Sequence, residues 1–366
     1  MRKTVLTGTV VAIVVVLFTL QSCEKEMAGS EVINNKPDDQ VSENLYTVST
    51  IAGNTDAGFL DGKGPEARFS DLRGIAISAD KRLFVAEGAN SAIREVNPAD
   101  SQVTTLAGNG TFGFANGRGR NATFNLPNDV TMGRNGNLYV TDFFNFRIRE
   151  ITRAGDVSTF AGADSGHVDG PLNQAQFSKL FSIVVCSDGI MYVADNFKIR
   201  KISVDGTVST IAGSTPGYQD GPGKDAKFGA VLDIAVAKDG ALYLADPENN
   251  AIRKISGGIV STVVKSSSGY LDGPLSNAQF SLPSGLAFGE DGSLYVADYG
   301  NHRIRKISSD NMVSTIAGSR SILDNQFADG PGATAKFYYP HGLAIYKNEL
   351  YVGDTGNNRI RKVALE

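Results

Sequence analysis

The chain has 366 residues, of which 41% are hydrophobic and 20% are charged, and its formal net charge is −4. This small negative excess excludes the strongly basic surface that nucleic-acid-binding proteins use. With two cysteines and three histidines, the composition also excludes a disulfide-stapled scaffold and a cysteine-ligated zinc protein.

The first 22 residues have the pattern of an export signal. Two basic residues precede an apolar run over residues 10–20, which is shorter than the about 20 residues that span a bilayer and suits the core of a secretory signal. The following Leu-Gln-Ser-Cys at 20–23 resembles a bacterial lipobox. We therefore expect residues 1–22 to be removed and Cys23 to carry a lipid. The alternative is an ordinary signal peptide followed by a chance cysteine.

Residues 23–44 are polar and show no hydrophobic periodicity, which is typical of a flexible tether. Acyl chains on Cys23 would hold the protein on a membrane through this tether. The signal and the tether resemble those of lipoproteins of the Bacteroidetes type. We therefore expect an exported protein, lipid-anchored in the bacterial outer membrane and facing the periplasm or the outside.

From residue 45 onward the chain repeats one unit six times. Each unit contains short runs rich in Val, Ile, Tyr and Thr, bounded by Asp-Gly or Asn-Gly turns, which predict a four-stranded antiparallel meander. Stacked radially, such sheets cover one another as the blades of a β-propeller. Every unit begins with Ala-x-Phe, and the six phenylalanines are Phe69, Phe124, Phe177, Phe228, Phe280 and Phe337.

The two ends of the chain complement each other. The sixth unit stops after its third strand, at residues 359–363, and the missing fourth-strand motif stands alone at residues 48–53. We expect this N-terminal strand to complete the last blade, because the pairing removes an exposed sheet edge. The predicted fold of residues 45–366 is therefore an all-β, six-bladed propeller closed by its first strand.

The second and third strands carry the pattern Asp-x-x-Asn-x-Arg-Ile shortly after Leu-Tyr-Val. It stands in full from Asp298 to Ile304 and from Asp354 to Ile360, while blade one has Glu87 in place of the first Asp. This pattern resembles the NHL repeat, and the resemblance covers about residues 45–366. The resemblance implies the six-bladed fold. It leaves function open, because relatives include RNA-binding modules, sensor domains, interaction scaffolds and a peptidyl-hydroxyglycine lyase.

Residues that recur in every blade are interpreted as architectural. They are the acid after Leu-Tyr-Val, the Arg of Ile-Arg, and an Asp or Asn before Gly in the loop that precedes each first strand. We expect the acid to accept backbone N–H bonds in the turn that follows it. The loop carboxylates come one per blade, whereas calcium needs six to eight converging oxygens, so we do not expect calcium there.

Function is expected where the blades differ, on the face that carries the loop before the first strand and the loop between strands two and three. The fourth residue after each repeat Phe should rim the central channel there, and these are Arg73, Asn128, Phe181, Leu232, Ser284 and His341. The next position reads Gly74, Asp129, Ser182, Asp233, Gly285 and Gly342. From these rows we select Arg73, Asn128, Asp129, Asp233 and His341 as candidate ligand-binding residues. The alternative is a channel mouth without a ligand.

Aromatic residues add to this candidate surface. Phe143 and Phe144 occur in the loop of blade two, and Tyr299 and Tyr338 occur in blades five and six. Rings gathered on one face would recognise a sugar or a protein. The alternative is that some of them pack between blades. RNA is disfavoured, because the chain lacks a basic face for phosphates.

An enzyme is the second hypothesis. His341, Asp129 and Asp233 would provide the three ligands of a catalytic metal in a lyase or hydrolase, although they come from blades spread around the ring. The sequence shows no Ser-His-Asp arrangement, phosphate loop or paired catalytic carboxylates. We therefore favour a non-catalytic lipoprotein that binds a protein or glycan, with no cofactor and no nucleic-acid partner.

Overall fold

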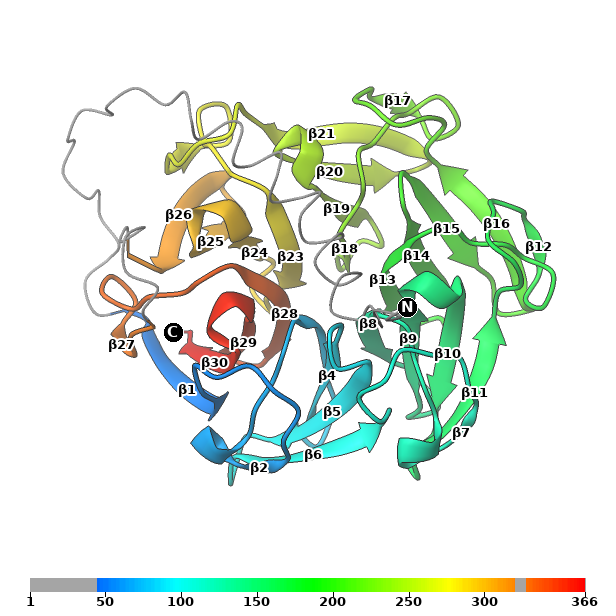
Figure 1. Cartoon of the computed structure of the whole chain (residues 1–366). Helices are drawn as coiled ribbons and strands as arrows, with labels where there is room; N and C mark the ends of the chain where they lie inside the picture. Colours follow the sequence, from blue (N-terminus) through cyan, green and yellow to red (C-terminus); the bar gives the residue numbers. More distant parts are fainter. Residues whose placement is uncertain (1–44, 320–326, 366) are drawn as a thin grey trace, which may run out of the picture. The chain divides into compact units, whose positions relative to one another are not determined.

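The computed structural model describes residues 45–319 and 327–365 as six antiparallel sheets arranged around a central channel (Figure 1). The predicted signal peptide, Cys23 and the predicted tether lie outside these residues. No helix in the described part of the chain has the length and apolarity needed to cross a membrane.

Four strands of each blade follow the predicted meander from the channel outward. The innermost strands are β3 (Leu72–Ile77), β8 (Pro127–Met132), β13 (Leu180–Val185), β18 (Asp233–Val236), β23 (Pro283–Phe288) and β28 (Pro340–Tyr346). The second strands are β4 (Leu83–Glu87), β9 (Leu138–Asp142), β14 (Met191–Asp195), β19 (Leu242–Asp246), β24 (Leu294–Asp298) and β29 (Glu349–Asp354).

The third and fourth strands complete the meander. The third strands are β5 (Ala92–Asn97), β10 (Arg147–Ile151), β15 (Lys198–Ile202), β20 (Ala251–Ser256), β25 (Arg303–Ile307) and β30 (Arg359–Ala364). The fourth strands are β6 (Gln102–Ala107), β11 (Asp156–Ala161), β16 (Thr207–Ala212), β21 (Ile259–Lys265), β26 (Met312–Ala317) and, in blade six, β1 (Thr47–Gly53).

Each blade has a fifth strand that the sequence did not reveal, so the prediction of four-stranded blades was wrong by one strand. It has two residues, comes from the loop before the innermost strand, and pairs with the fourth strand. A Gly-containing pair is too short to show the alternation that marks a strand. These strands are β2 (Gly62–Lys63), β7 (Gly117–Arg118), β12 (Gly170–Pro171), β17 (Gly221–Pro222), β22 (Gly273–Pro274) and β27 (Gly330–Pro331).

Short 3₁₀ helices complete the element list. They are η1 (Gly64–Glu66), η2 (Gly119–Asn121), η3 (Phe143–Asn145), η4 (Pro247–Asn249), η5 (Tyr299–Asn301) and η6 (Thr355–Asn357). The last four lie in the turns between second and third strands. These turns contact the loops that enter the innermost strands, as when Gly300 N–H donates to the carbonyl of Ser281. The two loop sets therefore share one face, as predicted.

The closure of the ring is confirmed. β1 pairs with β30 from Thr47 opposite Ala364 to Gly53 opposite Arg359, and it also pairs with β27. Figure 1 shows the blue first strand beside the red last strand. This pairing places strands from both ends of the described chain in one sheet, so no broad sheet edge is left open.

The hydrophobic core lies between neighbouring blades. One cluster, for example, joins Ala245 and Ile252 of blade four to Phe280 and Leu286 of blade five. Five of the repeat phenylalanines are fully buried, and Phe337 is 5% exposed. Each sheet thus buries an apolar face against the next blade, which a single blade cannot do alone.

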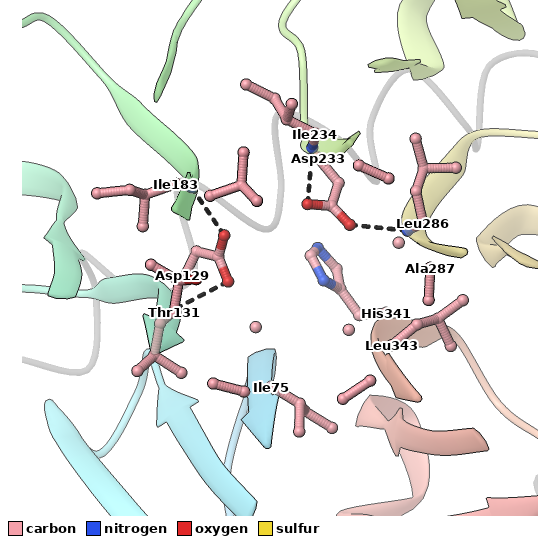
Figure 2. Close-up of a pocket in the computed structure, with 18 of the residues that line it drawn as sticks. Ile75, Asp129, Thr131, Ile183, Asp233, Ile234, Leu286, Ala287, His341 and Leu343 are labelled. Carbon is pink, nitrogen blue, oxygen red and sulfur yellow. Dashed lines mark hydrogen bonds between the residues drawn. The ribbon is translucent and has the colours of Figure 1, made fainter. Parts of the chain in front are cut away.

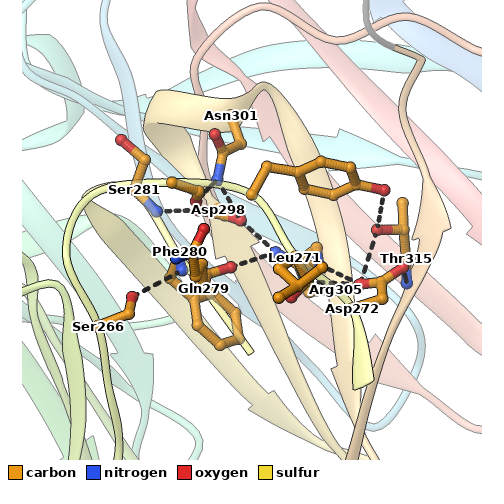
Figure 3. Close-up of polar contacts among 12 residues, drawn as sticks. Ser266, Leu271, Asp272, Gln279, Phe280, Ser281, Asp298, Asn301, Arg305 and Thr315 are labelled. Carbon is orange, nitrogen blue, oxygen red and sulfur yellow. Dashed lines mark hydrogen bonds and ion pairs between the residues drawn. The ribbon is translucent and has the colours of Figure 1, made fainter. Parts of the chain in front are cut away.

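A buried arginine ties the polar repeat residues together, as Figure 3 shows for blade five. Arg305 donates through Nη1 to Asp298 Oδ2 at 2.7 Å and through Nη2 to Asp272. The other oxygen of Asp298 accepts the N–H of Ser281, the residue after the repeat Phe, at 2.8 Å. These contacts confirm the architectural interpretation. They correct one detail, because the accepted N–H precedes the innermost strand instead of lying in the following turn.

The same arrangement recurs around the ring. The fully buried arginines are Arg94, Arg149, Arg200, Arg253, Arg305 and Arg361, and their fully buried acid partners are Glu87, Asp142, Asp195, Asp246, Asp298 and Asp354. Each guanidinium also lies over the repeat Phe ring of its blade, at 4.8 Å from the centroid in blade five. The pairing with charge and ring explains why these residues repeat.

Blade three departs from this pattern, and a histidine compensates. In the other five blades an asparagine of the turn between strands two and three donates to the acid, as Asn301 does to Asp298 at 2.8 Å. The turn of blade three is two residues shorter and lacks an asparagine at this position. Instead, Nδ1 of His167, from the loop before β13, lies 3.1 Å from Oδ2 of Asp195.

Candidate functional site

The six innermost strands enclose a cavity of about 330 Å³ on the channel axis. Figure 2 shows apolar side chains such as Ile75, Leu286 and Leu343 around it, together with the polar side chains of Asp129, Asp233 and His341. The structure thus brings four of the sequence-predicted residues to one cavity: Asn128, Asp129, Asp233 and His341. The polar groups come from the start of their strands and the apolar ones mostly from further along.

Asp129 lies in β8 of blade two and reaches into blade three. Its Oδ1 accepts the N–H of Val130 at 2.8 Å, and its Oδ2 accepts the N–H of Ile183 in β13 at 2.9 Å. The carboxylate therefore fixes two neighbouring innermost strands to each other. Its own position is fixed by the same bonds.

Asp233 has the corresponding role at the start of β18. Its Oδ1 accepts the N–H of Ile234 and the hydroxyl of Ser182, both at 2.8 Å. Its Oδ2 accepts the N–H of Leu286 in β23 at 2.7 Å. Asp233 thus connects blades three, four and five.

The charge of these two carboxylates has no partner in the cavity wall. No lysine or arginine of the described chain lines the cavity. Burial raises the pKa of both carboxyls, and for Asp129 repulsion from Asp233 raises the pKa further. Hydrogen bonds from backbone N–H groups oppose this rise, because they favour the ionised form.

His341 enters the cavity from β28 of blade six, and its ring points towards the two carboxylates (Figure 2). Its Nδ1 is buried and has no hydrogen-bond partner. Burial, helped by the positive charge of Arg73, lowers the pKa of His341 to about 4. The imidazole is therefore neutral at pH 7 and offers one acceptor and one donor nitrogen.

The position directly after each rim residue is glycine in three blades and aspartate or serine in the other three. Close packing between neighbouring blades explains the glycines. A Cβ on Gly74 would lie 1.9 Å from Asp129 Oδ1, and one on Gly285 would lie 2.0 Å from the carbonyl oxygen of His341. At these points the backbones of neighbouring blades approach too closely for a side chain. Asp129 and Asp233 occupy the corresponding positions where their carboxylates bridge the blades.

At the mouth of the cavity, Arg73 and Asn128 form a chain of hydrogen bonds. Arg73 Nη2 lies 3.0 Å from Asp71 Oδ2, and Arg73 Nη1 donates to Asn128 Oδ1 at 2.8 Å. Asn128 Nδ2 in turn donates to the carbonyl of Phe181 at 2.6 Å. This chain runs from blade one to blade three and holds the rim in place.

The phenylalanines of blade two form one aromatic cluster with a ring of blade three. The ring centroids of Phe143 and Phe144 are 4.8 Å apart, and those of Phe143 and Phe181 are 5.0 Å apart. Phe143 is only 5% exposed and supports the other two, which are half-buried. Phe144 and Phe181 are therefore the rings of this cluster that a ligand can reach.

The tyrosines of blades five and six form a second aromatic cluster. The ring centroid of Tyr339 lies 4.7 Å from that of Tyr299 and 4.4 Å from that of Tyr338. His302 packs on Tyr339 at 4.5 Å and accepts its backbone N–H through Nδ1 at 3.1 Å. Because blades five and six are opposite blades two and three, the two clusters face each other across the mouth.

Three residues of these clusters were placed on this face by the sequence but were not selected as site residues. Phe181 is in the row of rim residues, Tyr339 follows the selected Tyr338, and His302 lies in the turn between strands two and three of blade five. The sequence did not show that their rings pack together.

Comparison with known proteins identifies the repeat. Residues 280–307 and 337–363 match the NHL repeat. The chain is 31% identical over 281 residues to Protein SUPPRESSOR OF QUENCHING 1, chloroplastic, of Arabidopsis thaliana, which covers 70% of this chain and 27% of that protein. It is 27% identical over 327 residues to human NHL repeat-containing protein 2, which covers 76% of this chain and 44% of that protein. The chain thus spans less than half the length of these curated relatives.

A solved structure shares the architecture. An auxiliary nutrient binding protein from Bacteroides thetaiotaomicron superposes with a TM-score of 0.67 over 92% of this chain and 81% of that chain, at 15% sequence identity. A likeness at this identity establishes the fold alone. Together, the repeat match and the six sheets show NHL repeats in a six-bladed β-propeller.

Proposed function

We propose that this NHL-repeat propeller is a non-catalytic binding protein of the bacterial cell envelope, and that the mouth of its channel binds a glycan. The observation that carries the proposal is the pair of aromatic clusters on opposite sides of the mouth. Rings held by their neighbours offer large contact area at little cost in conformational entropy.

The mouth combines the two kinds of contact that a sugar requires. The half-buried rings of Phe144, Phe181 and Tyr299 offer apolar faces, while the Arg73–Asn128 chain places polar groups between the clusters. Ligand sites of this type join apolar walls to a few fixed polar groups. The nutrient-binding role of the Bacteroides structure with the same fold is in line with this proposal.

A protein ligand fits the mouth less well than a glycan. Stable protein interfaces bury about 800 Å² on each partner, and their central anchors are large side chains that fill pockets. Here the exposed rings are half-buried and pack on one another within each cluster. The site therefore favours a small or slender ligand.

Anchoring through Cys23 belongs to the same proposal. The export pattern of residues 1–22 and the polar segment after it support a lipid anchor in the outer membrane. Replacing Cys23 by serine should release the protein from the membrane fraction and remove the mass of the acyl chains. An unchanged membrane fraction would contradict the anchor.

The metal-dependent alternative has little geometric support. Among the described residues, no group of three His, Cys, Asp or Glu side chains is arranged to hold a metal ion. All four carboxylate oxygens of Asp129 and Asp233 already accept hydrogen bonds. Their bonds across the blade boundaries favour a fixed polar lining over a flexible ligand set.

Binding to a glycan array with the full chain tests the proposal. For a glycan that binds, Tyr299→Ala or Phe144→Ala should raise the dissociation constant at least tenfold. Tyr346→Ala is the matched control, because this tyrosine lies at the opposite end of β28 from His341 and should leave binding unchanged. Absence of glycan binding, or capture of a protein that all three variants retain, would contradict the proposal.

A further inference from the structure

The two channel acids, Asp129 and Asp233, are partly exposed to the cavity and lack the cation that the fully buried blade acids of the described chain possess. Each of the six buried blade acids contacts a buried arginine at 2.6 to 3.1 Å. Asp129 and Asp233 receive only backbone and serine donors. Burial and repulsion from Asp233 raise the pKa of Asp129 to about 8, so the pair carries about one negative charge at pH 7, and a bound cation would balance that charge.

His341 adds a third polar side chain to the cavity. Its Nδ1 is buried and has no hydrogen-bond partner, so the ring can meet a ligand only through Nε2. The ring points into the same cavity as the two carboxylates (Figure 2). Three groups with acceptor atoms therefore face one space, and none is matched by a charged donor of the protein.

Most of the other side chains that line the cavity are apolar, although Asn128 and Thr131 also belong to its wall. Ile75, Ile234, Leu286 and Leu343 surround the space next to the polar groups. Its volume of about 330 Å³ exceeds the need of a bare ion. Such a wall favours a ligand that carries a hydrocarbon part along with its polar end.

We propose that the channel binds an organic molecule with a primary ammonium group, which lies against Asp129, Asp233 and His341 while its apolar part packs against the innermost strands. An ammonium group has three N–H donors, one for each of the three acceptor groups. This inference goes beyond the glycan site at the mouth and does not depend on it.

Hydrogen bonds to an ammonium group suit these acceptors better than metal–ligand bonds do. Metal–ligand bonds to oxygen and nitrogen measure about 2.0–2.6 Å, and no three ligands in the described residues are grouped for such bonds. Hydrogen bonds reach about 2.7–3.2 Å between heavy atoms, so they span a wider arrangement. The negative charge of the acid pair disfavours an anionic ligand.

Isothermal titration of the full chain at pH 7 with benzylamine and with benzyl alcohol tests the proposal. The two probes have the same ring and differ in charge. We expect benzylamine to bind with a dissociation constant at least tenfold lower than that of benzyl alcohol. Equal affinities, or no binding of benzylamine, would overturn the proposal. The comparison uses the unmodified chain, so it does not depend on the folding of a variant.

Charge variants sharpen the result. Asp233→Asn should weaken benzylamine binding at least tenfold, whereas Asp225→Asn removes the same charge from an exposed loop and should have no effect. Equal losses in both variants would overturn the proposal, and so would displacement of benzylamine by equimolar calcium chloride. Glycan binding that persists when benzylamine fails would leave the proposed function intact and reject only this inference.

Discussion

The carboxylates of the blades and those of the channel differ in how their negative charge is balanced. Both groups accept backbone N–H bonds: Asp298 holds the N–H of Ser281, and Asp233 holds the N–H of Leu286. In the blade, a fully buried arginine balances the charge. In the channel, no arginine or lysine of the described chain lines the wall.

The blade and channel carboxyls also differ in the groups that shift their pKa. Burial raises the pKa of Asp298, and the charge of Arg305 opposes that rise. Burial also raises the pKa of Asp233, but only hydrogen bonds oppose it. Complete pairing, repeated in every blade, indicates architecture. Incomplete pairing, found only where the blades differ, indicates a place for a ligand.

The largest expected effect comes from removing the pairing in a blade. Arg305→Leu would leave Asp298 buried without its cation, and breaking a buried pair costs about 3–5 kcal/mol. Denaturation with urea should show a loss of this size in the free energy of unfolding. Arg134→Leu, at an exposed position, serves as the control. A loss below about 1 kcal/mol for Arg305→Leu would contradict the architectural role.

The channel histidine should make the fold sensitive to acid. The pKa of His341 is lowered to about 4 from an ordinary value of 6.5. Below pH 6.5 the unfolded chain therefore binds a proton that the folded chain does not, so stability falls as the pH drops towards 4. The difference corresponds to about 3 kcal/mol.

His341→Gln removes this titration and measures it. Between pH 7 and pH 4 the unmodified chain should lose about 3 kcal/mol more stability than the variant in urea denaturation. His302 is present in both proteins, so its own titration cancels. Parallel pH profiles for the two proteins would show that His341 is not kept neutral by the fold.

Close packing between the innermost strands of blades one and two should make the stability of the fold sensitive to a single added methyl group. Gly74→Ala would place a Cβ 1.9 Å from Asp129 Oδ1, and relieving such overpacking costs about 1–3 kcal/mol. Gly353→Ala is a matched control, because its nearest atoms would be 3.6 Å away. Thermal denaturation should destabilise the first variant and spare the second. Equal thermal midpoints for the two variants would show that the side chain of Asp129 can move aside without cost.

The smallest expected effect tests the compensation in blade three. His167→Phe restores the aromatic type common at this repeat position but removes one hydrogen-bond partner of Asp195, and the loss of one such hydrogen bond costs about 1 kcal/mol. His167→Gln, which keeps a donor, should lose less. The order of the thermal midpoints checks this. A His167→Phe variant as stable as the unmodified chain would contradict the compensation.

The fold was predictable because the repeat supplies six readings of one pattern. The closure by β1 was predictable because the fourth-strand motif missing from the sixth unit stands at residues 48–53, before the first unit. The fifth strands escaped prediction because two residues carry no periodicity. The role of His167 escaped as well, since a ring substitution in one loop and a deletion in another turn have no visible connection in the sequence.

The sequence predicted which residues lie at the channel but not which contacts they make there. The repeat register placed Asp129, Asp233 and His341 at the channel, and all three line the cavity. It gave no indication that the carboxylates bond across the blade boundaries, because those partners are backbone N–H groups. Nor did it show that Phe143 is buried beneath Phe144 and Phe181, since ring packing depends on the angle between neighbouring blades.

A crystal structure of the full chain with benzylamine tests most directly the claim that the channel acids bind a cationic group. We expect the amine nitrogen within hydrogen-bond distance of Asp129, Asp233 and His341, with the ring against the apolar strands. An amine bound elsewhere, or one whose ring faces the carboxylates, would contradict it.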